Sequence, residues 1–143
     1  MINNKNVPAK GRSASGGKKI LIVEDEQDLR EALTDKLTRE GFSVLAAKNG
    51  EEGLKVALDA RPDLILLDIV MPIMDGMTMM KKLREENEWG KNVSIILLTN
   101  LSATDEIISG IVEDEPAYYL VKSDWKIGDV VKKVRERLGI EAQ

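Results

Sequence analysis

Short apolar runs alternate along the chain with stretches in which apolar residues recur every three or four positions. The runs are too short for helices and rich in branched side chains, so they predict five β-strands. These strands fall at residues 18–23, 42–47, 63–68, 93–100 and 117–122. The helical spacing predicts helices over 29–37, 50–60, 75–87, 103–112 and 127–138, of which the fourth has the weakest pattern.

The apolar runs also predict how the strands are arranged. Strands that read as continuous apolar runs are buried on both faces, as in a parallel sheet. Strict alternation of strands and helices favours right-handed crossovers and a doubly wound α/β sandwich of three layers. In such folds, binding sites form at the carboxyl ends of the strands.

Polar residues stand at the end of four of the five predicted strands or directly after it. These residues are Glu24, Asp25 and Glu26 at the first strand, Asp68 at the third, Thr99 and Asn100 at the fourth, and Lys122, Ser123 and Asp124 at the fifth. A parallel sheet places all of these positions at one edge. Asp68, on the central strand, is expected beside Glu24 and Asp25 from the neighbouring strand.

This set of residue types suits the reception of a phosphoryl group. Clustered carboxylates repel one another unless a cation compensates, and Mg²⁺ fits an all-oxygen ligand set. Lys122 adds a positive charge and Thr99 a hydroxyl donor, while the carboxylate of Asp68 can become an acyl phosphate. Each residue alone could be a turn residue, a helix cap or a solvated side chain. Their joint occurrence on four strands favours the phosphoryl-acceptor interpretation.

Composition narrows the possible chemistry further. The chain has 143 residues, which suits one domain, and it contains neither cysteine nor histidine. Disulfides, thiolate catalysis, Ser-His-Asp catalysis and histidine-containing zinc sites are therefore excluded. No apolar run is long enough to span a membrane and no secretory leader is visible, so we expect a cytoplasmic protein.

Charge separates a basic N-terminal segment from an acidic body. Residues 1–17 are polar, carry Lys5, Lys10 and Arg12 and no acid, and are expected to be a disordered tail. Without those three bases, 18 basic residues face 25 acidic ones, a net charge of −7 for the body. Direct binding of nucleic acid is therefore not expected. We assign the folded domain to residues 18–139 and a short C-terminal end to 140–143.

Four motifs give the sequence a family resemblance. "ILIVEDE", "DLILLDIVMPIMDG", "IILLT" and "YYLVK" resemble the receiver domain of chemotaxis-type response regulators in two-component signal transduction. The resemblance covers residues 18–139. It implies a flavodoxin-like (βα)5 fold with a five-stranded parallel sheet in the order 2-1-3-4-5.

The resemblance also implies roles for individual residues. Asp68 is expected to be the phosphorylated aspartate, and Asp25 a direct Mg²⁺ ligand, with Glu24 acting through water. The backbone carbonyl of Val70 is the implied further metal ligand. Thr99 and Lys122 are the implied hydroxyl and lysine partners of the phosphoryl group.

A switch and a set of partners follow from the same resemblance. Tyr119 is expected to turn inward on phosphorylation as Thr99 moves, although it could also be a half-buried strand aromatic. The resemblance implies a phosphodonor histidine on a sensor kinase or phosphotransfer protein, which agrees with the absence of histidine here. It also implies a downstream protein target on the face formed by the fourth helix, the fifth strand and the fifth helix.

Three departures from the family pattern lie on or beside that face. Ser123 follows Lys122 where proline is usual, Asn100 follows Thr99 where a small residue is usual, and residues 112–119 replace a turn that normally contains glycine and alanine. The phosphorylation chemistry is expected to survive them. A stable dimer of the kind that many receivers form through this face is not expected, so we expect a monomer or a weak dimer.

Two other classes of protein remain as alternatives. A phosphatase of the haloacid-dehalogenase type also uses an aspartate at a strand end, but it needs a second aspartate where Val70 stands. A receiver-like binding module that is never phosphorylated usually lacks one of the acids, the acceptor or the lysine, all of which are present. We expect no enzyme beyond self-catalysed phosphorylation and dephosphorylation, either as a stand-alone receiver or as part of a longer protein.

Overall fold

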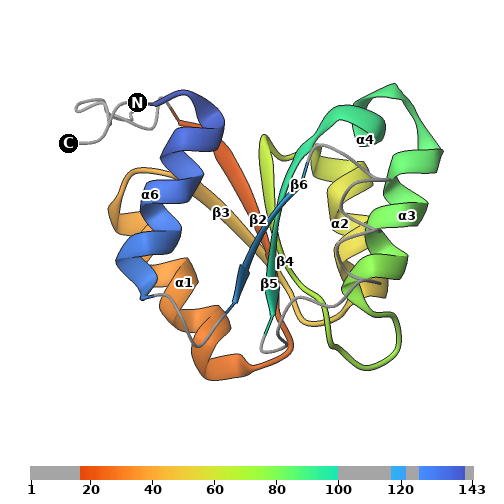
Figure 1. Cartoon of the computed structure of the whole chain (residues 1–143), viewed down its shortest axis with the longest axis horizontal. Coiled ribbons are helices and arrows are strands. Elements are labelled where there is room, and N and C mark those ends of the chain that lie inside the picture. Colours follow the sequence, from red (N-terminus) through yellow and green to blue (C-terminus); the bar gives the residue numbers. More distant parts are fainter. Residues whose placement is uncertain (1–16, 100–116, 122–125, 141–143) are drawn as a thin grey trace, which may run out of the picture.

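The computed structural model describes residues 17–99, 117–121 and 126–140, and a central sheet divides it into three layers (Figure 1). Five parallel strands form the sheet in the order β3-β2-β4-β5-β6. Their bounds are β2 Lys19–Val23, β3 Ser43–Ala47, β4 Leu64–Asp68, β5 Ser94–Thr99 and β6 Ala117–Val121. The predicted doubly wound, flavodoxin-like sheet with strand order 2-1-3-4-5 is confirmed.

Helices cover both faces of the sheet. On one face lie α1 (Gln27–Arg39) and α6 (Ile127–Leu138); on the other lie α2 (Gly50–Ala60), α3 (Gly76–Glu86) and the short α4 (Glu88–Asn92) (Figure 1). The predicted helix at 103–112 and the predicted tail lie outside the described residues, apart from Gly17. Within the described ranges, no helix is both long and apolar enough to cross a membrane.

The apolar strands serve two cores because successive side chains point to opposite faces of the sheet. In β2, Leu21 and Val23 pack into the core under α2 and α3, whereas Ile20 and Ile22 pack into the core under α1 and α6. All four side chains are completely buried. This two-sided burial is the physical reason for the continuous apolar runs in the sequence.

The helix α4 was not predicted. Asn87 ends α3 and begins α4, with its side chain accepting a hydrogen bond from the Gly90 amide at 2.7 Å. The buried Arg84 then donates to the carbonyls of Gly90 and Val93, both at 2.8 Å. The half-buried Trp89 packs on the core below α2 and α3.

One ion pair joins α1 to α6. The guanidinium of Arg135, 6% exposed, donates to the carboxylate of Glu40 at 2.8 Å and lies over the ring of Phe42 at 5.4 Å. The hydrogen bond from Arg135 is the largest cause that lowers the pKa of Glu40 below its ordinary value. The pair therefore fixes the C-terminal end of α1 against the last helix.

Candidate functional site at the carboxyl edge of the sheet

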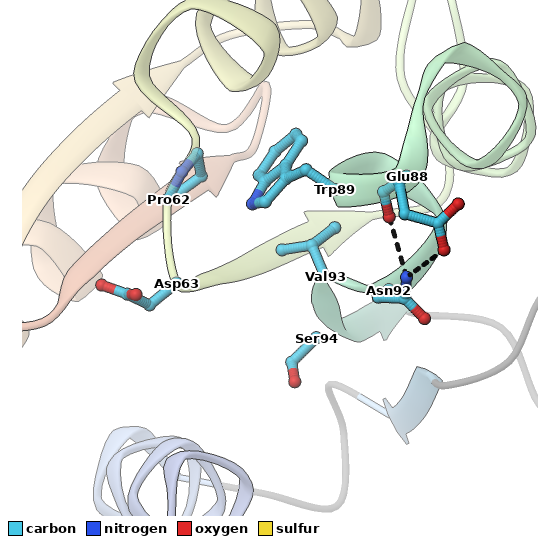
Figure 2. Close-up of a pocket in the computed structure, with 7 residues that line it drawn as sticks. All are labelled: Pro62, Asp63, Glu88, Trp89, Asn92, Val93 and Ser94. Carbon is cyan, nitrogen blue, oxygen red and sulfur yellow. Dashed lines mark hydrogen bonds between the residues drawn. The ribbon is translucent and has the colours of Figure 1, made fainter.

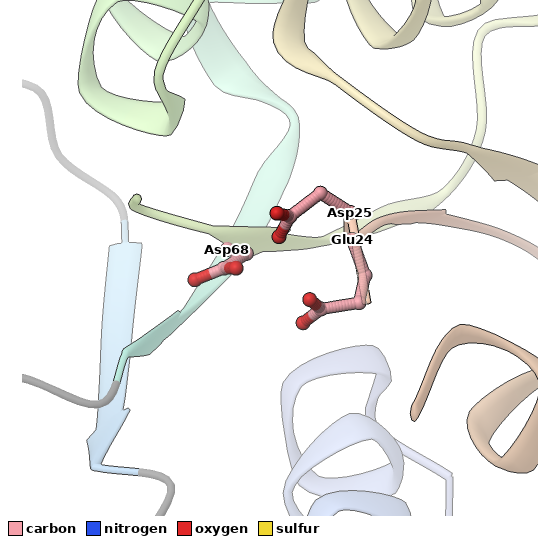
Figure 3. A group of neighbouring side chains, drawn as sticks. All are labelled: Glu24, Asp25 and Asp68. Atoms are coloured by element: carbon pink, nitrogen blue, oxygen red, sulfur yellow. The ribbon is translucent and has the colours of Figure 1, made fainter. Parts of the chain in front are cut away.

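Three carboxylates meet at the carboxyl ends of β2 and β4. One oxygen each from Glu24, Asp25 and Asp68 lies within 4.8 Å of the others, and the three groups face a common space (Figure 3). Glu24 is completely buried and Asp68 is 4% exposed, whereas Asp25 is exposed. The predicted neighbourhood of these three acids is therefore confirmed in geometry.

The sheet register explains why Asp68 reaches this position. Asp68 is the last residue of β4, and the amide of the next residue, Ile69, donates to the Leu98 carbonyl at 3.0 Å. The chain then turns back, and the Gly76 amide donates to the Ile69 carbonyl at 2.8 Å. A Cβ atom on Gly76 would overlap the carbonyl oxygen of Asp68, so only glycine allows this close return.

The turn that carries the other two acids is held by backbone groups and by one arginine. The Glu24 amide continues the sheet ladder by donating to Ala47 at 3.0 Å, and the Glu24 carboxylate accepts from the Glu26 amide at 3.0 Å. From the first turns of α1, the Nη1 atom of Arg30 donates to the carbonyls of Glu24 at 2.9 Å and Asp25 at 3.3 Å. The turn is thus anchored on both of its sides.

The loop after β4 exposes apolar side chains beside the acids. Val70 is 59% exposed and Ile73 is 75% exposed. Ile73 has a φ of 70°, and the Met74 amide donates to the Pro72 carbonyl at 2.7 Å, which makes a three-residue γ-turn of the rare, strained form. Val70 thus lies in the loop directly after Asp68, and its role as a metal ligand stays a prediction.

Of the remaining predicted site residues, Thr99 and Tyr119 lie in described strands, whereas Lys122 does not belong to the described residues. Thr99 ends β5 and pairs in register with Val121, the residue before Lys122. The backbone of Thr99 is therefore at the same sheet edge as Asp68, while Lys122 lies outside the described residues. Tyr119 pairs in register with Leu97 inside β6, and its role as a switch stays a prediction.

The three departures from the family pattern fall mostly outside the described part of the chain. Asn100, Ser123 and residues 112–116 lie outside the described residues. Their expected effects on phosphate loss and on dimer formation remain predictions.

Sequence reasoning missed the part played by Arg30. The only signal was an arginine five residues after Asp25 on the predicted helix, and that spacing does not reveal a contact with backbone carbonyls. The close approach of Gly76 to the Asp68 carbonyl depends on the fold and was not predicted from the sequence.

A pocket lies at the edge of the sheet opposite the three acids (Figure 2). It encloses about 410 Å³ and is lined by Pro62, Asp63, Glu88, Trp89, Asn92, Val93 and Ser94. Both of its carboxylates already accept hydrogen bonds of the fold. Asp63 accepts from the Lys19 amide at 2.8 Å, and Glu88 accepts from the Asn92 side chain at 3.2 Å.

Comparisons with known proteins agree with the geometry of the acid site. The family model of the response regulator receiver domain matches residues 20–135. Transcriptional regulatory protein AfsQ1 of Streptomyces coelicolor is 37% identical over 103 residues, which are 72% of this chain and 44% of AfsQ1. DNA-binding response regulator MtrA of Mycolicibacterium smegmatis is 33% identical over 120 residues, which are 84% of this chain and 50% of MtrA.

A solved structure is similar over nearly its whole length. Response regulator protein TrrA of Thermotoga maritima, in complex with Mg²⁺ and BeF, has a TM-score of 0.71 and 34% identity, covering 83% of this chain and 97% of TrrA. The chain spans about half the length of AfsQ1 and MtrA. The family match over most of the chain, together with the shared fold and the acid site, shows that this chain belongs to the response regulator receiver domains of two-component systems.

Proposed function

We propose that Asp68 accepts a phosphoryl group from a phosphohistidine of a sensor kinase or phosphotransfer protein. The observation that carries this proposal is the meeting of Glu24, Asp25 and Asp68 at the carboxyl edge of the sheet. Membership of the receiver family supports it, because a phosphoacceptor role is implied by the family. The motif "LLDIVMPIMDG", which contains Asp68, predicts the same phosphoacceptor role.

The three acids fit Mg²⁺ by their chemistry and by their spacing. Oxygens that bind one Mg²⁺ directly, at about 2.1 Å, lie at most about 4.2 Å apart. A group of oxygens within 4.8 Å of one another suits two direct ligands, Asp25 and Asp68, with Glu24 acting through water. The backbone carbonyl of Val70 is the proposed fourth protein group. When bound, Mg²⁺ neutralises carboxylate charge and coordinates phosphoryl oxygens.

The side chains of this chain would carry out the transfer itself. An oxygen of Asp68 attacks the phosphorus and forms a P–O bond while the P–N bond of the phosphohistidine breaks. The electron pair of that bond leaves with the imidazole of the donor, which then takes up a proton. Thr99 and Lys122 are proposed to donate to the phosphoryl oxygens, where negative charge is concentrated.

The output is proposed to be a change of surface rather than a catalysed reaction. Thr99 and Tyr119 would switch the face made by β6, α6 and the predicted helix at 103–112, and a downstream protein would bind that face. Members of this family are generally not classed as enzymes, and only self-catalysed gain and loss of phosphate is proposed here. We place this exchange in the cytoplasm, with the receiver as a monomer or weak dimer.

One of the similar proteins is named for its binding to DNA. MtrA is named a DNA-binding response regulator, and this chain spans half of its length. Our expectation of no direct nucleic-acid contact concerns the acidic body of this chain, and it stays a prediction.

Intact-mass spectrometry tests the proposed acceptor. The protein is incubated with acetyl phosphate, with and without Mg²⁺, beside an Asp68→Asn variant. We expect a labile gain of one phosphoryl group that requires both Mg²⁺ and Asp68. No gain in a protein that is shown to bind Mg²⁺ would support the alternative, a receiver-like module that works without phosphorylation.

A further inference from the structure

We propose that Arg30 is a positioning residue for the cation, because it fixes the turn that presents Glu24 and Asp25. This inference rests on the Mg²⁺ site of the proposed function. It concerns a side chain whose described hydrogen bonds go to backbone carbonyls of this turn. Its contacts are with the backbone that carries the two acids.

The contacts of Arg30 bridge two consecutive peptide groups. Its Nη1 atom donates to the Glu24 carbonyl at 2.9 Å and to the Asp25 carbonyl at 3.3 Å. The backbone of Arg30 is itself fixed, because its amide donates to the Glu26 carbonyl at 2.9 Å and its carbonyl accepts from the Thr34 hydroxyl at 2.7 Å. A rigid helix therefore sets the position of the turn through one side chain.

The turn needs such an anchor because its side chains repel one another. Glu24 and Asp25 are adjacent in sequence, and both place carboxylate oxygens within 4.8 Å of Asp68. Glu24 is buried and has a backbone partner in the Glu26 amide, but Asp25 is exposed and follows the end of the sheet ladder. Without Arg30, the Asp25 peptide would lose its described link to α1 and could swing outward, away from Asp68.

A positioning role and a purely electrostatic role of Arg30 predict opposite changes in Mg²⁺ affinity when the side chain is removed. Arginine is always protonated, so Arg30 adds a positive charge near the place where a cation would bind. By charge alone, its removal would strengthen Mg²⁺ binding. If positioning dominates, its removal weakens binding, because the cation must then order the turn that carries its ligands.

Isothermal titration with Mg²⁺ alone separates these two effects. The wild type, Arg30→Gln and Arg30→Lys are compared at a temperature at which circular dichroism shows each to be fully folded. Arg39→Gln is the matched control: it removes the same charge from the other end of α1, where Arg39 pairs with the exposed Asp35 at 2.8 Å. We expect the Kd of Arg30→Gln to rise about fivefold or more, since ordering even one residue costs that much.

Arg30→Lys and Arg39→Gln test whether a loss of Mg²⁺ affinity comes from the contacts of Arg30 rather than from its charge. Arg30→Lys keeps the charge and can reach one carbonyl, so its Kd should lie between those of the wild type and Arg30→Gln. Arg39→Gln should stay within about twofold of the wild type. In the metal-free protein, the Glu26 amide should exchange hydrogen faster in Arg30→Gln than in Arg39→Gln, a difference that does not depend on any bound ion.

Two outcomes overturn different parts of the account. If the wild type binds Mg²⁺ and Arg30→Gln binds equally well or more tightly, the positioning role is wrong and the metal site stands. If the folded wild type binds no Mg²⁺, the metal site of the proposed function is wrong and the inference falls with it. If Arg30→Gln does not fold, the comparison of Arg30→Lys with the wild type decides in the same way.

Discussion

Neutralising Asp25 should stabilise the metal-free protein and remove most of its response to Mg²⁺. Asp25 brings a third negative charge to within 4.8 Å of Glu24 and Asp68. At that separation, each repulsive pair costs about 0.9 kcal/mol in a water-like dielectric and about 3.5 kcal/mol at an effective dielectric of 20. Asp25 is exposed, so the lower value is the better guide, and its two pairs together cost about 1–2 kcal/mol.

The substitution Asp25→Asn keeps the shape of the side chain and removes this charge. In EDTA, the free energy of unfolding should rise by about 1–2 kcal/mol, and the melting temperature by about 3–6 °C for a chain of this size. In Mg²⁺ the order should reverse. A ligand present at 100 times its Kd stabilises the protein that binds it by about 2.7 kcal/mol, and the variant has lost a direct ligand.

Urea unfolding followed by circular dichroism, in EDTA and at several Mg²⁺ concentrations, measures both effects. Asp59→Asn is the control, because it removes one exposed negative charge from the last turn of α2, next to Ala60, whose carbonyl accepts from Lys19 at the opposite end of β2 from Glu24. It should change stability by no more than about 0.5 kcal/mol and leave the response to Mg²⁺ intact. The reasoning fails if Asp25→Asn is less stable than the wild type in EDTA, or if Mg²⁺ stabilises both proteins equally.

Three further substitutions test other parts of the structure. Gly76→Ala should lower the free energy of unfolding by about 3 kcal/mol or more in urea, because the new methyl group would overlap the Asp68 carbonyl; a loss below about 1 kcal/mol would contradict the close approach. Glu40→Gln should cost about 1–3 kcal/mol at neutral pH by leaving Arg135 without its carboxylate. Because the folded-state pKa of Glu40 is lowered, this difference should be present above the unfolded-state pKa and should vanish as the pH falls through the folded-state pKa; a difference that persists at still lower pH would refute it. Ile73→Gly should raise stability by about 0.5–1 kcal/mol by relieving the γ-turn, net of glycine's entropy, whereas Ile73→Ala keeps the strain; equal thermal stability of the two variants would argue against strain at this position.

The strands could be predicted closely because both faces of the sheet are buried. The run at 63–68 contains four buried apolar residues followed by Asp68, and the structure places β4 at Leu64–Asp68. In a parallel sheet, the position of a strand end also fixes the edge at which its next residue lies. That is why the meeting of Glu24, Asp25 and Asp68 could be predicted from sequence.

Features that depend on single backbone contacts could not be predicted. The helix α4 has only five residues and depends on the Asn87 cap and on Arg84 contacting two carbonyls. The contact of Arg30 with the Glu24 carbonyl leaves no trace in hydrophobic periodicity. Ile73 is a β-branched residue at a positive φ, against its local preference, because the loop must close between Pro72 and Gly76.

The most direct test of the account identifies the atom that receives the phosphoryl group. The protein is phosphorylated by acetyl phosphate with Mg²⁺, reduced with borohydride, which converts an aspartyl phosphate into homoserine, and mapped by peptide mass spectrometry. The account predicts homoserine at position 68, lost without Mg²⁺ and lost in the Asp68→Asn variant. Homoserine at Asp25 or Asp75, or reduction at position 68 that is independent of Mg²⁺, would contradict it.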